Sequence, residues 1–141
     1  MLLGIDLGGT KIEGIVLKSR ENPEEIIRHR VDTEEDKGYS QVISNIKSLV
    51  EHIENNINHK FNKLGIGTPG TIDPGSGLLK NSNSQCLNGM PIQKDLSKTL
   101  DKTILIQNDA NCFALAETLL GSVKDQYPNA KNVFGIIMGT G

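Results

Sequence analysis

The sequence lacks the cysteine and histidine spacing of a metal centre. Its two cysteines, Cys86 and Cys112, stand far apart and form no CxxC pair, and His29, His52 and His59 add no ligand spacing. We therefore expect two free thiols and no zinc site in this chain. The sequence also has no block of lysines and arginines, and its formal net charge is −2. That balance gives no electrostatic reason for a polyanion partner, so nucleic acid is not expected to bind.

Long apolar runs and a leader segment are missing too. The chain passes from Met1 directly into a strand-like pattern, without the basic start and apolar run of a signal peptide, and no stretch is long and apolar enough to span a membrane. We expect a cytoplasmic protein without a membrane partner. With 141 residues, of which 36% are hydrophobic and 23% charged, the chain is long enough for one domain with a buried core.

The most chemically distinctive stretch is Leu3–Lys11. Its apolar residues alternate with glycine and aspartate, and Gly8-Gly9 then allow a tight turn into a second apolar run, which predicts a β-hairpin. Glycines at such a turn supply backbone angles that other residues resist, and they let main-chain N–H groups approach an anion. Asp6 would then hold a magnesium ion through water, and Thr10 and Lys11 would reach phosphate oxygens. From this stretch alone, a plain Gly-Gly hairpin with an incidental aspartate explains the pattern equally well.

Periodicity along the rest of the chain predicts alternating strands and helices. Apolar residues recur every three or four positions between Lys37 and Lys60, which predicts a helix of about five turns that covers the sheet. Residues 71–91 are mostly Gly, Ser, Asn and Pro, and so long a loop in a compact domain is more often a binding loop than a mobile surface connection. Strands are expected at 3–7, 12–17, 26–31, 64–67, 103–107 and 133–138, and further helices at 92–100 and 108–120.

Two glycine-containing motifs each suggest a nucleotide-binding motif, but the neighbouring sequence excludes both. Gly65–Gly70 follows a strand and matches the GxGxxG dinucleotide fingerprint, but Pro69 and the loop from Thr71 prevent the helix that this fingerprint requires. Gly9–Lys11 has the residue types that end a P-loop, but in the reverse order and without the preceding glycine spacing. We therefore expect neither a dinucleotide site of that kind nor a P-loop.

The second chemically distinctive position is Asp109, which follows Asn108 at a strand-to-helix junction. The common role of such an aspartate is an N-cap, whose carboxylate accepts hydrogen bonds from the first N–H groups of the helix. The alternative role is catalytic, because open α/β folds place ligand-binding groups at the carboxyl ends of their strands. An aspartate there can accept the proton of a hydroxyl in phosphoryl transfer, and the helix N-terminus would keep it ionised. Asn108 can donate and accept in fixed directions, which suits the hydroxyls of a sugar.

These motifs together resemble those of the ROK family of sugar kinases, within the actin/hexokinase/Hsp70 superfamily. The resemblance rests on Asp6–Lys11, Gly67–Gly70, Asn108–Asn111 and Gly139–Gly141, and it covers Leu3–Gly141. It implies a ribonuclease-H-like α/β lobe, with a mixed sheet and flanking helices. That lobe would be the N-terminal one of a two-lobed enzyme that closes over ATP and a hexose.

The resemblance also implies roles for individual residues. Asp109 matches the catalytic base and Asn108 a ligand of the sugar hydroxyls, with ATP and Mg²⁺ as cofactors. The first phosphate loop is matched by Asp6, Gly8, Gly9, Thr10 and Lys11, and Asp6 would hold the metal through water. The second phosphate loop begins at Gly139, Thr140 and Gly141. Further sugar contacts are matched by Gly70, Thr71 and Asn83.

Within the family, Asn81–Ser84, Leu87–Gly89 and Asn108–Leu115 look most like bacterial manno(fructo)kinases and N-acetylglucosamine kinases. The main expectation is phosphorylation of a hexose hydroxyl, as by a fructokinase, mannokinase or glucokinase, and an N-acetylhexosamine kinase is an alternative. A sugar-sensing transcriptional regulator of the same family is a second alternative. It is disfavoured because Met1 adjoins the first strand, without space for a DNA-binding segment, and because regulators often lose the aspartate that Asp109 preserves. An actin-like polymerising protein would share the phosphate loop but would not explain the Asn108-Asp109 turn.

The family's Glu- and His-containing sugar motif and its Cys-rich zinc motif lie beyond the second phosphate loop, where this sequence ends. We therefore expect residues 1–141 to be a single N-terminal lobe, truncated at that loop, of a parent enzyme that is a homodimer. A structural zinc would belong to the other lobe. Because water is not excluded from half a site, the lobe alone is expected to bind sugar weakly and to transfer no phosphate.

Overall fold

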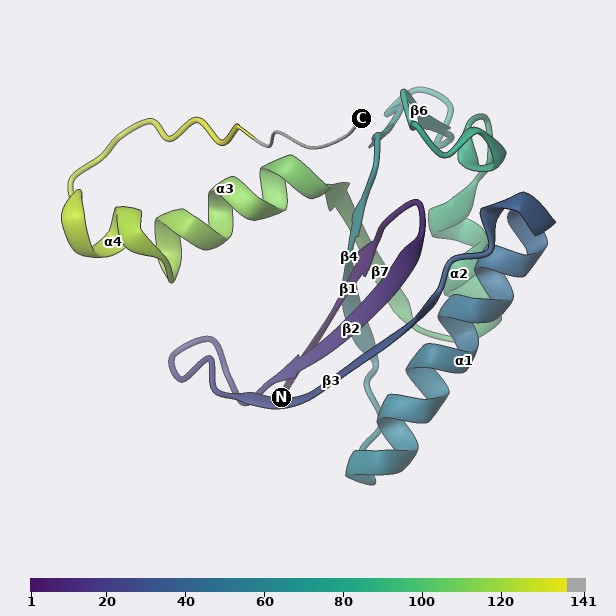
Figure 1. Ribbon diagram of the computed structural model, residues 1–141, viewed down its shortest axis with the longest axis horizontal. Helices are drawn as coiled ribbons and strands as arrows, with labels where there is room; N and C mark the ends of the chain where they lie inside the picture. The colour runs from purple at the N-terminus through teal and green to yellow at the C-terminus, as the bar shows by residue number, and fades with distance from the viewer. Residues whose placement is uncertain (137–141) are drawn as a thin grey trace.

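The computed structural model describes residues 1–136, in which a mixed β-sheet lies between helices on its two faces (Figure 1). The strands are β1 (Leu2–Leu7), β2 (Lys11–Leu17), β3 (Glu25–Asp32), β4 (Lys63–Thr68), β5 (Thr71–Ile72), β6 (Leu79–Lys80) and β7 (Thr103–Asn108). The helices are α1 (Tyr39–Ile57), α2 (Ile92–Leu100), α3 (Asp109–Leu119) and α4 (Ser122–Gln126), with short 3₁₀ turns η1 (Glu35–Lys37) and η2 (Gln85–Leu87).

The main sheet has the strand order β3-β2-β1-β4-β7. The first three strands form an antiparallel meander, and β4 and β7 then add to β1 in parallel. Parallel neighbours require a crossover, and α1 and α2 supply these connections on the same face of the sheet (Figure 1). The carboxyl ends of β1, β4 and β7 therefore meet at one edge, as the strand pattern predicts for a ligand-binding fold.

The core lies between the sheet and the two crossover helices. Leu3, Ile5 and Leu7 of β1 point to this face because side chains alternate along a strand, and each is at most 4% exposed. The apolar stripe of α1, with Ile46 and Leu49 at its centre, packs against them and is fully buried. The predicted helix between Lys37 and Lys60 and its sheet-covering role are confirmed.

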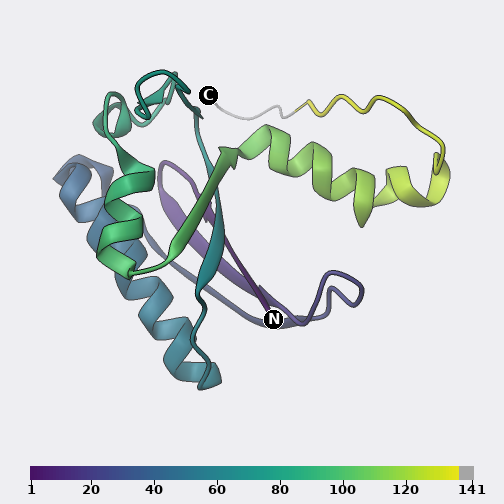
Figure 2. The same ribbon diagram turned by 180° about the vertical axis from the view of Figure 1, so that it is seen from behind.

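The opposite face of the sheet is only partly covered. Helix α3 leaves the end of β7 and runs away from the sheet on this side, followed by α4 (Figure 2). Large apolar side chains such as Leu105 of β7 and Phe113 of α3 stay 49% and 42% exposed there. In the described part of the chain, no helix combines the length and the apolar character that a membrane crossing requires.

The α/β fold with a mixed sheet is confirmed, and the structure adds short elements that the sequence did not predict. The long loop at 71–91 is not structureless, because β5 and β6 pair as a small antiparallel ribbon and η2 follows them. A fourth helix, α4, follows α3. Thr68–Gly70 leads into β5 and not into a helix, which agrees with the exclusion of a dinucleotide fingerprint.

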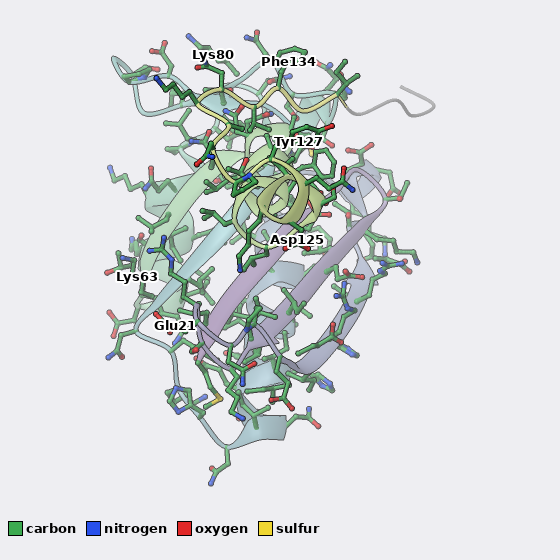
Figure 3. The ribbon with its side chains drawn as sticks, turned by 90° about the vertical axis from the view of Figure 1, so that its left-hand side faces the viewer. Glu21, Lys63, Lys80, Asp125, Tyr127 and Phe134 are labelled. Atoms are coloured by element: carbon green, nitrogen blue, oxygen red, sulfur yellow. The ribbon has the colours of Figure 1, made fainter. Side chains whose placement is uncertain are left out.

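The strand predicted at 133–138 is wrong for its described part. Val133–Ile136 is irregular, and Phe134 and Ile136 are 88% and 69% exposed. The apolar run has the composition of a buried strand, but in the described structure it passes beside α3, and not along an edge of the sheet that could pair with it. Figure 3 shows Phe134 on this outer segment and Tyr127 at the end of α4. The remainder of the predicted strand lies outside the described residues.

Candidate functional site

Two of the predicted site residues, Asp6 of β1 and Asp109 of α3, line one open cleft of about 830 Å³ on the sparsely covered face of the sheet. Its floor comes from β1, β2, β4 and β7, and α3 forms its wall. The polar side chains of this lining are Asp6, Glu13, Gln107, Asp109 and Cys112. The fold therefore brings Asp6 and Asp109 together although 102 positions separate them in the sequence.

Strand register places a row of residues across the sheet at this cleft. Arg30 of β3 lies opposite Glu13 of β2, which lies opposite Asp6 of β1, and Asp6 is the register partner of Gly67 on β4. The Arg30 Nε–H donates to Glu13 Oε2 at 2.7 Å. Glu13 is thereby neutralised from the outer strand, while Asp6 has no cation among the described residues as a direct ion-pair partner.

Gly67 makes the approach of Asp109 to Asp6 possible. A β-carbon at Gly67 would lie 3.7 Å from the Asp109 Cα and 3.8 Å from the Cys112 Sγ. These distances are ordinary contacts for a methyl group, so any larger side chain would fill the gap between the two carboxylates. Glycine at this point keeps the cleft open between β1 and α3.

The surroundings of Asp6 shift the pKa of its carboxyl group. Partial burial in the cleft raises the pKa of Asp6, the negative charges of Asp109 and Glu13 raise it further, and Arg30 acts in the opposite direction. Two carboxylates that repel each other in an open cleft fit a divalent cation, which would relieve this repulsion. Within residues 1–136, no three His, Cys, Asp or Glu side chains cluster as a ready metal cage. A magnesium ion here would keep water or phosphate oxygens as its other ligands.

Both cysteines are free thiols, as expected. Burial, Asp109 and Asp6 all raise the pKa of Cys112, in that order of size. Burial and the charge of Glu35 raise the pKa of Cys86. Because the thiolate is the reactive form, these shifts disfavour reactivity at both positions.

The predicted hairpin is present, but its glycines act differently from the prediction. Neither Gly8 nor Gly9 has a positive φ, so the turn does not need the backbone angles that favour glycine. Gly8 is required by close approach, since its N–H donates to the Lys11 carbonyl at 3.0 Å and a β-carbon would lie 2.9 Å from that oxygen. At Gly9 the nearest neighbour of a β-carbon would be Ser84 Oγ, at 3.5 Å. The long loop therefore lies against the hairpin.

The hairpin's polar side chains point away from the protein interior. Thr10 is exposed. The Lys11 ammonium forms an ion pair with Asp32, directly across from it on β3, and both side chains are more than half exposed. Such an exposed pair is weak, so Lys11 can exchange Asp32 for a phosphate at little cost.

Asn108, and not Asp109, is the N-cap of α3. Its Oδ1 accepts from the Asn111 N–H at 3.3 Å, and its Nδ2 donates to the Gly70 carbonyl at 3.2 Å. Asp109 is the first helical residue, and its Oδ1 accepts from the Ala110 N–H at 2.7 Å. The N-cap interpretation of Asp109 is therefore wrong, and its carboxylate faces the cleft.

Gly70 has a structural reason to be glycine. Its φ is 121°, and a β-carbon would lie 2.6 Å from the Lys80 carbonyl oxygen. Thr71 and Asn83 are exposed and do not belong to the cleft lining, so their role as sugar contacts stays a prediction. Gly139, Thr140 and Gly141 lie outside the described residues.

A group of buried hydroxyls beside the hairpin was missed from the sequence. Thr33, Thr68, Ser82 and Ser84 are each at most 4% exposed. Only burial in the fold distinguishes these four hydroxyls from those of ordinary loop residues. The local sequence pattern of small polar residues does not.

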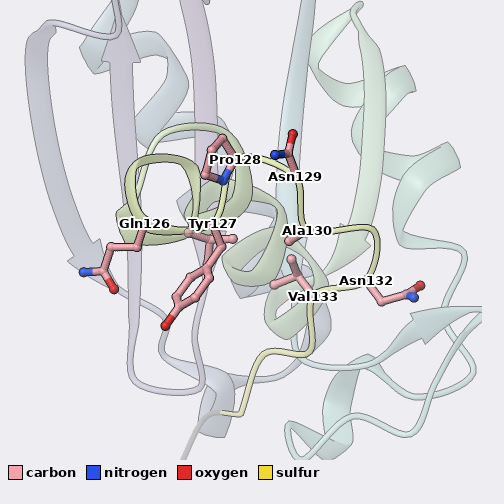
Figure 4. Close-up of a pocket in the computed structure, with 8 residues that line it drawn as sticks. Gln126, Tyr127, Pro128, Asn129, Ala130, Asn132 and Val133 are labelled. Atoms are coloured by element: carbon pink, nitrogen blue, oxygen red, sulfur yellow. The ribbon is translucent and has the colours of Figure 1, made fainter.

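A separate hollow of about 600 Å³ beyond α4, lined by residues such as Tyr127 and Pro128, contains none of the predicted site residues (Figure 4).

Comparison with known proteins agrees with this geometry. Residues 2–141 match the ROK family. The chain is 38% identical over its whole length to an N-acetyl-D-glucosamine kinase of Mannheimia succiniciproducens, of which it spans 44%.

Solved structures give the same fold. The ROK hexokinase of Thermus thermophilus superimposes with a TM-score of 0.70 and 29% identity, over 82% of this chain and 37% of that one. An inorganic polyphosphate/ATP-glucomannokinase of Arthrobacter sp. strain KM gives a TM-score of 0.72 and 26% identity, over 86% and 49%. This chain therefore belongs to the ROK family and has the fold of the N-terminal lobe of ROK kinases.

Proposed function

We propose that this chain is the N-terminal lobe of an ATP-dependent sugar kinase whose acceptor is an N-acetylhexosamine. The observation that carries the proposal is the single cleft in which Asp6 and Asp109 face each other next to the β1–β2 hairpin. One carboxylate then serves the phosphate donor and the other serves the acceptor. Gly67, which lies beside Asp6 and below the start of α3, adds no side chain to the cleft at this point.

The acceptor is inferred from a relative that is 38% identical over the whole chain, an N-acetyl-D-glucosamine kinase. This relative favours the alternative from the sequence over the fructokinase, mannokinase or glucokinase expectation. The chain spans 44% of that relative, so the substrate of the whole enzyme stays a proposal.

Asp109 is the proposed general base. In the transfer step, the sugar hydroxyl gives its proton to the Asp109 carboxylate, the hydroxyl oxygen forms a bond to the γ-phosphorus of ATP, and ADP leaves with the electron pair of the broken bond. The position of Asp109 in the first turn of α3 favours the ionised form that this step needs. One of its oxygens is held by the Ala110 N–H, which leaves the other for the hydroxyl.

The hairpin is the proposed phosphate site. Among residues 1–136, no acceptor takes the N–H groups of Gly9 and Thr10, and both residues are at least partly exposed. Adjacent free main-chain N–H groups form an anion site of the kind that phosphates occupy. Lys11 adds a positive charge, which is paired with Asp32 in an exposed ion pair. A magnesium ion would be held by Asp6 through water and would neutralise charge on the phosphates.

Asn108 keeps hydrogen-bonding capacity for a sugar. Its bonds to Asn111 and Gly70 use one N–H and one lone pair, and an amide side chain has one more of each. Because those bonds fix the side chain, its remaining donor and acceptor have fixed directions. Gly70, Thr71 and Asn83 stay proposed sugar contacts that depend on closure of the loop.

A panel of sugars tests the proposal on this chain. We expect N-acetylglucosamine to raise the melting temperature more than glucose, mannose or fructose at equal concentration, and Asp109→Ala to remove the difference. In a coupled assay with ATP and magnesium, the lobe alone should give no turnover. Equal responses to all four sugars in the parent chain and in Asp109→Ala would contradict the sugar site. A sugar-sensing regulator needs the sugar contacts but not the base, so sugar binding without any turnover by the full-length parent protein with an intact Asp109 would favour that alternative.

A further inference from the structure

The β1–β2 hairpin is held in shape by a residue from outside it. The Thr33 hydroxyl donates to the Gly8 carbonyl at 2.7 Å, and the Thr33 N–H donates to the Thr10 carbonyl at 3.0 Å. Thr33 thus bonds both sides of the turn. Its side chain is fully buried, so water does not compete for these bonds.

Thr33 is itself fixed by α1. The Asn45 Nδ2 donates to the carbonyl oxygens of Asp32 and Thr33, at 3.1 and 3.2 Å. The next residue, Glu34, has a left-handed backbone with φ of 56°, and its carboxylate accepts from the Gln41 Nε2 at 3.0 Å. The segment that carries Thr33 is therefore anchored to the long helix of the core.

Thr33 takes the carbonyl oxygens of Gly8 and Thr10, whereas the N–H groups of Gly9 and Thr10 have no acceptor in the described part of the chain. The Gly8 carbonyl and the Gly9 N–H belong to one peptide unit, so the bond from Thr33 keeps this unit from rotating to present its oxygen to an anion. The bond to the Thr10 carbonyl fixes the turn on its other side. The turn keeps this orientation without positive φ angles at Gly8 or Gly9.

We infer that Thr33 is a positioning residue for the phosphate site. It links α1 to the hairpin and holds the turn in the orientation that offers N–H groups to phosphate. This inference rests on the proposed nucleotide-binding function and assigns Thr33 no contact with the ligand. It predicts that loss of one buried hydroxyl lowers nucleotide affinity at a site the side chain does not touch.

Three variants separate this role from simple stability. Thr33→Val keeps the shape and removes the hydroxyl, and Thr33→Ser keeps the hydroxyl. Thr68→Val is the matched control, because Thr68 is also a fully buried threonine but its hydroxyl has no hydrogen-bond partner among the described residues. Affinity for the magnesium complex of AMPPNP is measured by amide chemical-shift titration. Hydrogen exchange of the Gly8 N–H is measured without nucleotide.

Thr33→Val is expected to weaken nucleotide binding and to speed Gly8 exchange, each by about fivefold to tenfold, because a net hydrogen bond has this value. Thr33→Ser and Thr68→Val should stay within about twofold of the parent chain. If Thr33→Val lowers the melting temperature but leaves both readouts at the parent values, the positioning role is wrong and the proposed function stands. If the parent chain itself gives no nucleotide response, the nucleotide site is wrong and the role of Thr33 in it is wrong as well.

Discussion

Asp6 on β1 and Asp109 at the start of α3 meet across Gly67, where a β-carbon would lie only 3.7 Å from the Asp109 Cα. Their negative charges act on each other in a cleft that partly removes water, and the pKa of Asp6 rises in consequence. The pair is the proposed chemical centre of the lobe. Its coupling can be measured without any ligand.

Asp109→Asn is expected to lower the pKa of Asp6, because it removes one of the charges that disfavour ionisation of Asp6. Carboxyl ¹³C chemical shifts followed against pH report the midpoint of Asp6. Asp73, whose pKa is lowered by the Gly75 N–H and Lys80 far from this cleft, serves as the internal control and should not move. An unchanged Asp6 midpoint would mean that the two carboxylates do not share the cleft.

Asp6→Asn is expected to stabilise the fold near neutral pH. The pKa of Asp6 in the folded chain lies above its ordinary value of 3.8, so its contribution to stability is greatest below that value and is lost as the pH rises through the folded pKa. Removing the charge should raise the melting temperature at about pH 7 and have little effect at about pH 3.5. Equal effects at both pH values would contradict the electrostatic explanation.

Lys102→Met is expected to destabilise the fold by about 3 kcal/mol, because it removes the more buried of the two lysines that pair with the buried carboxylate of Glu54. Glu54 is 3% and Lys102 11% exposed, and the two are joined at 2.8 Å. Urea unfolding measures the loss. The matched control is Lys47→Met, which breaks an exposed pair with Glu51 and should change stability by less than about 0.5 kcal/mol.

The same pair predicts a loss of stability in acid. Burial alone would raise the pKa of Glu54, but hydrogen bonds from Lys102, the Phe61 N–H and Lys60 lower it below its ordinary value. A lowered carboxyl pKa contributes stability above the unfolded value and loses it as the pH falls through the folded value. The stability gap between the parent chain and Lys102→Met should therefore narrow in acid. A gap that is independent of pH would point to packing alone.

Gly70→Ala is expected to destabilise the fold by about 1–3 kcal/mol, because alanine resists a φ of 121° and its β-carbon would meet the Lys80 carbonyl. A displacement of the backbone at Gly70 should also disturb Asn108, whose side chain donates to the Gly70 carbonyl. Gly75→Ala on the same loop is the control, since the nearest atom to its β-carbon would be a side-chain oxygen at 3.6 Å. Equal melting temperatures for the two variants would show that backbone strain at Gly70 is unimportant.

Much of the fold could be predicted from local patterns. Alternation in Leu3, Ile5 and Leu7 and the helical spacing of Ile46 and Leu49 follow from the direction in which each side chain must point to reach one core. The apolar run at Val133–Ile136 shows the limit of this reasoning. The composition of a segment does not say whether the fold will place it beside an edge of the sheet, where it could pair as a strand.

The sequence by itself determined the order of strands and helices, the hairpin at Gly8-Gly9 and the position of Asp109 at a strand-to-helix junction, because all of these depend on neighbours a few residues away. Only the tertiary structure decided that Asp6 and Asp109 line one cleft beside Gly67, that Asn108 bonds the Gly70 carbonyl, and that Thr33 holds the hairpin. These relationships join residues far apart in the chain. They arise from strand register and crossover packing, which no local pattern contains.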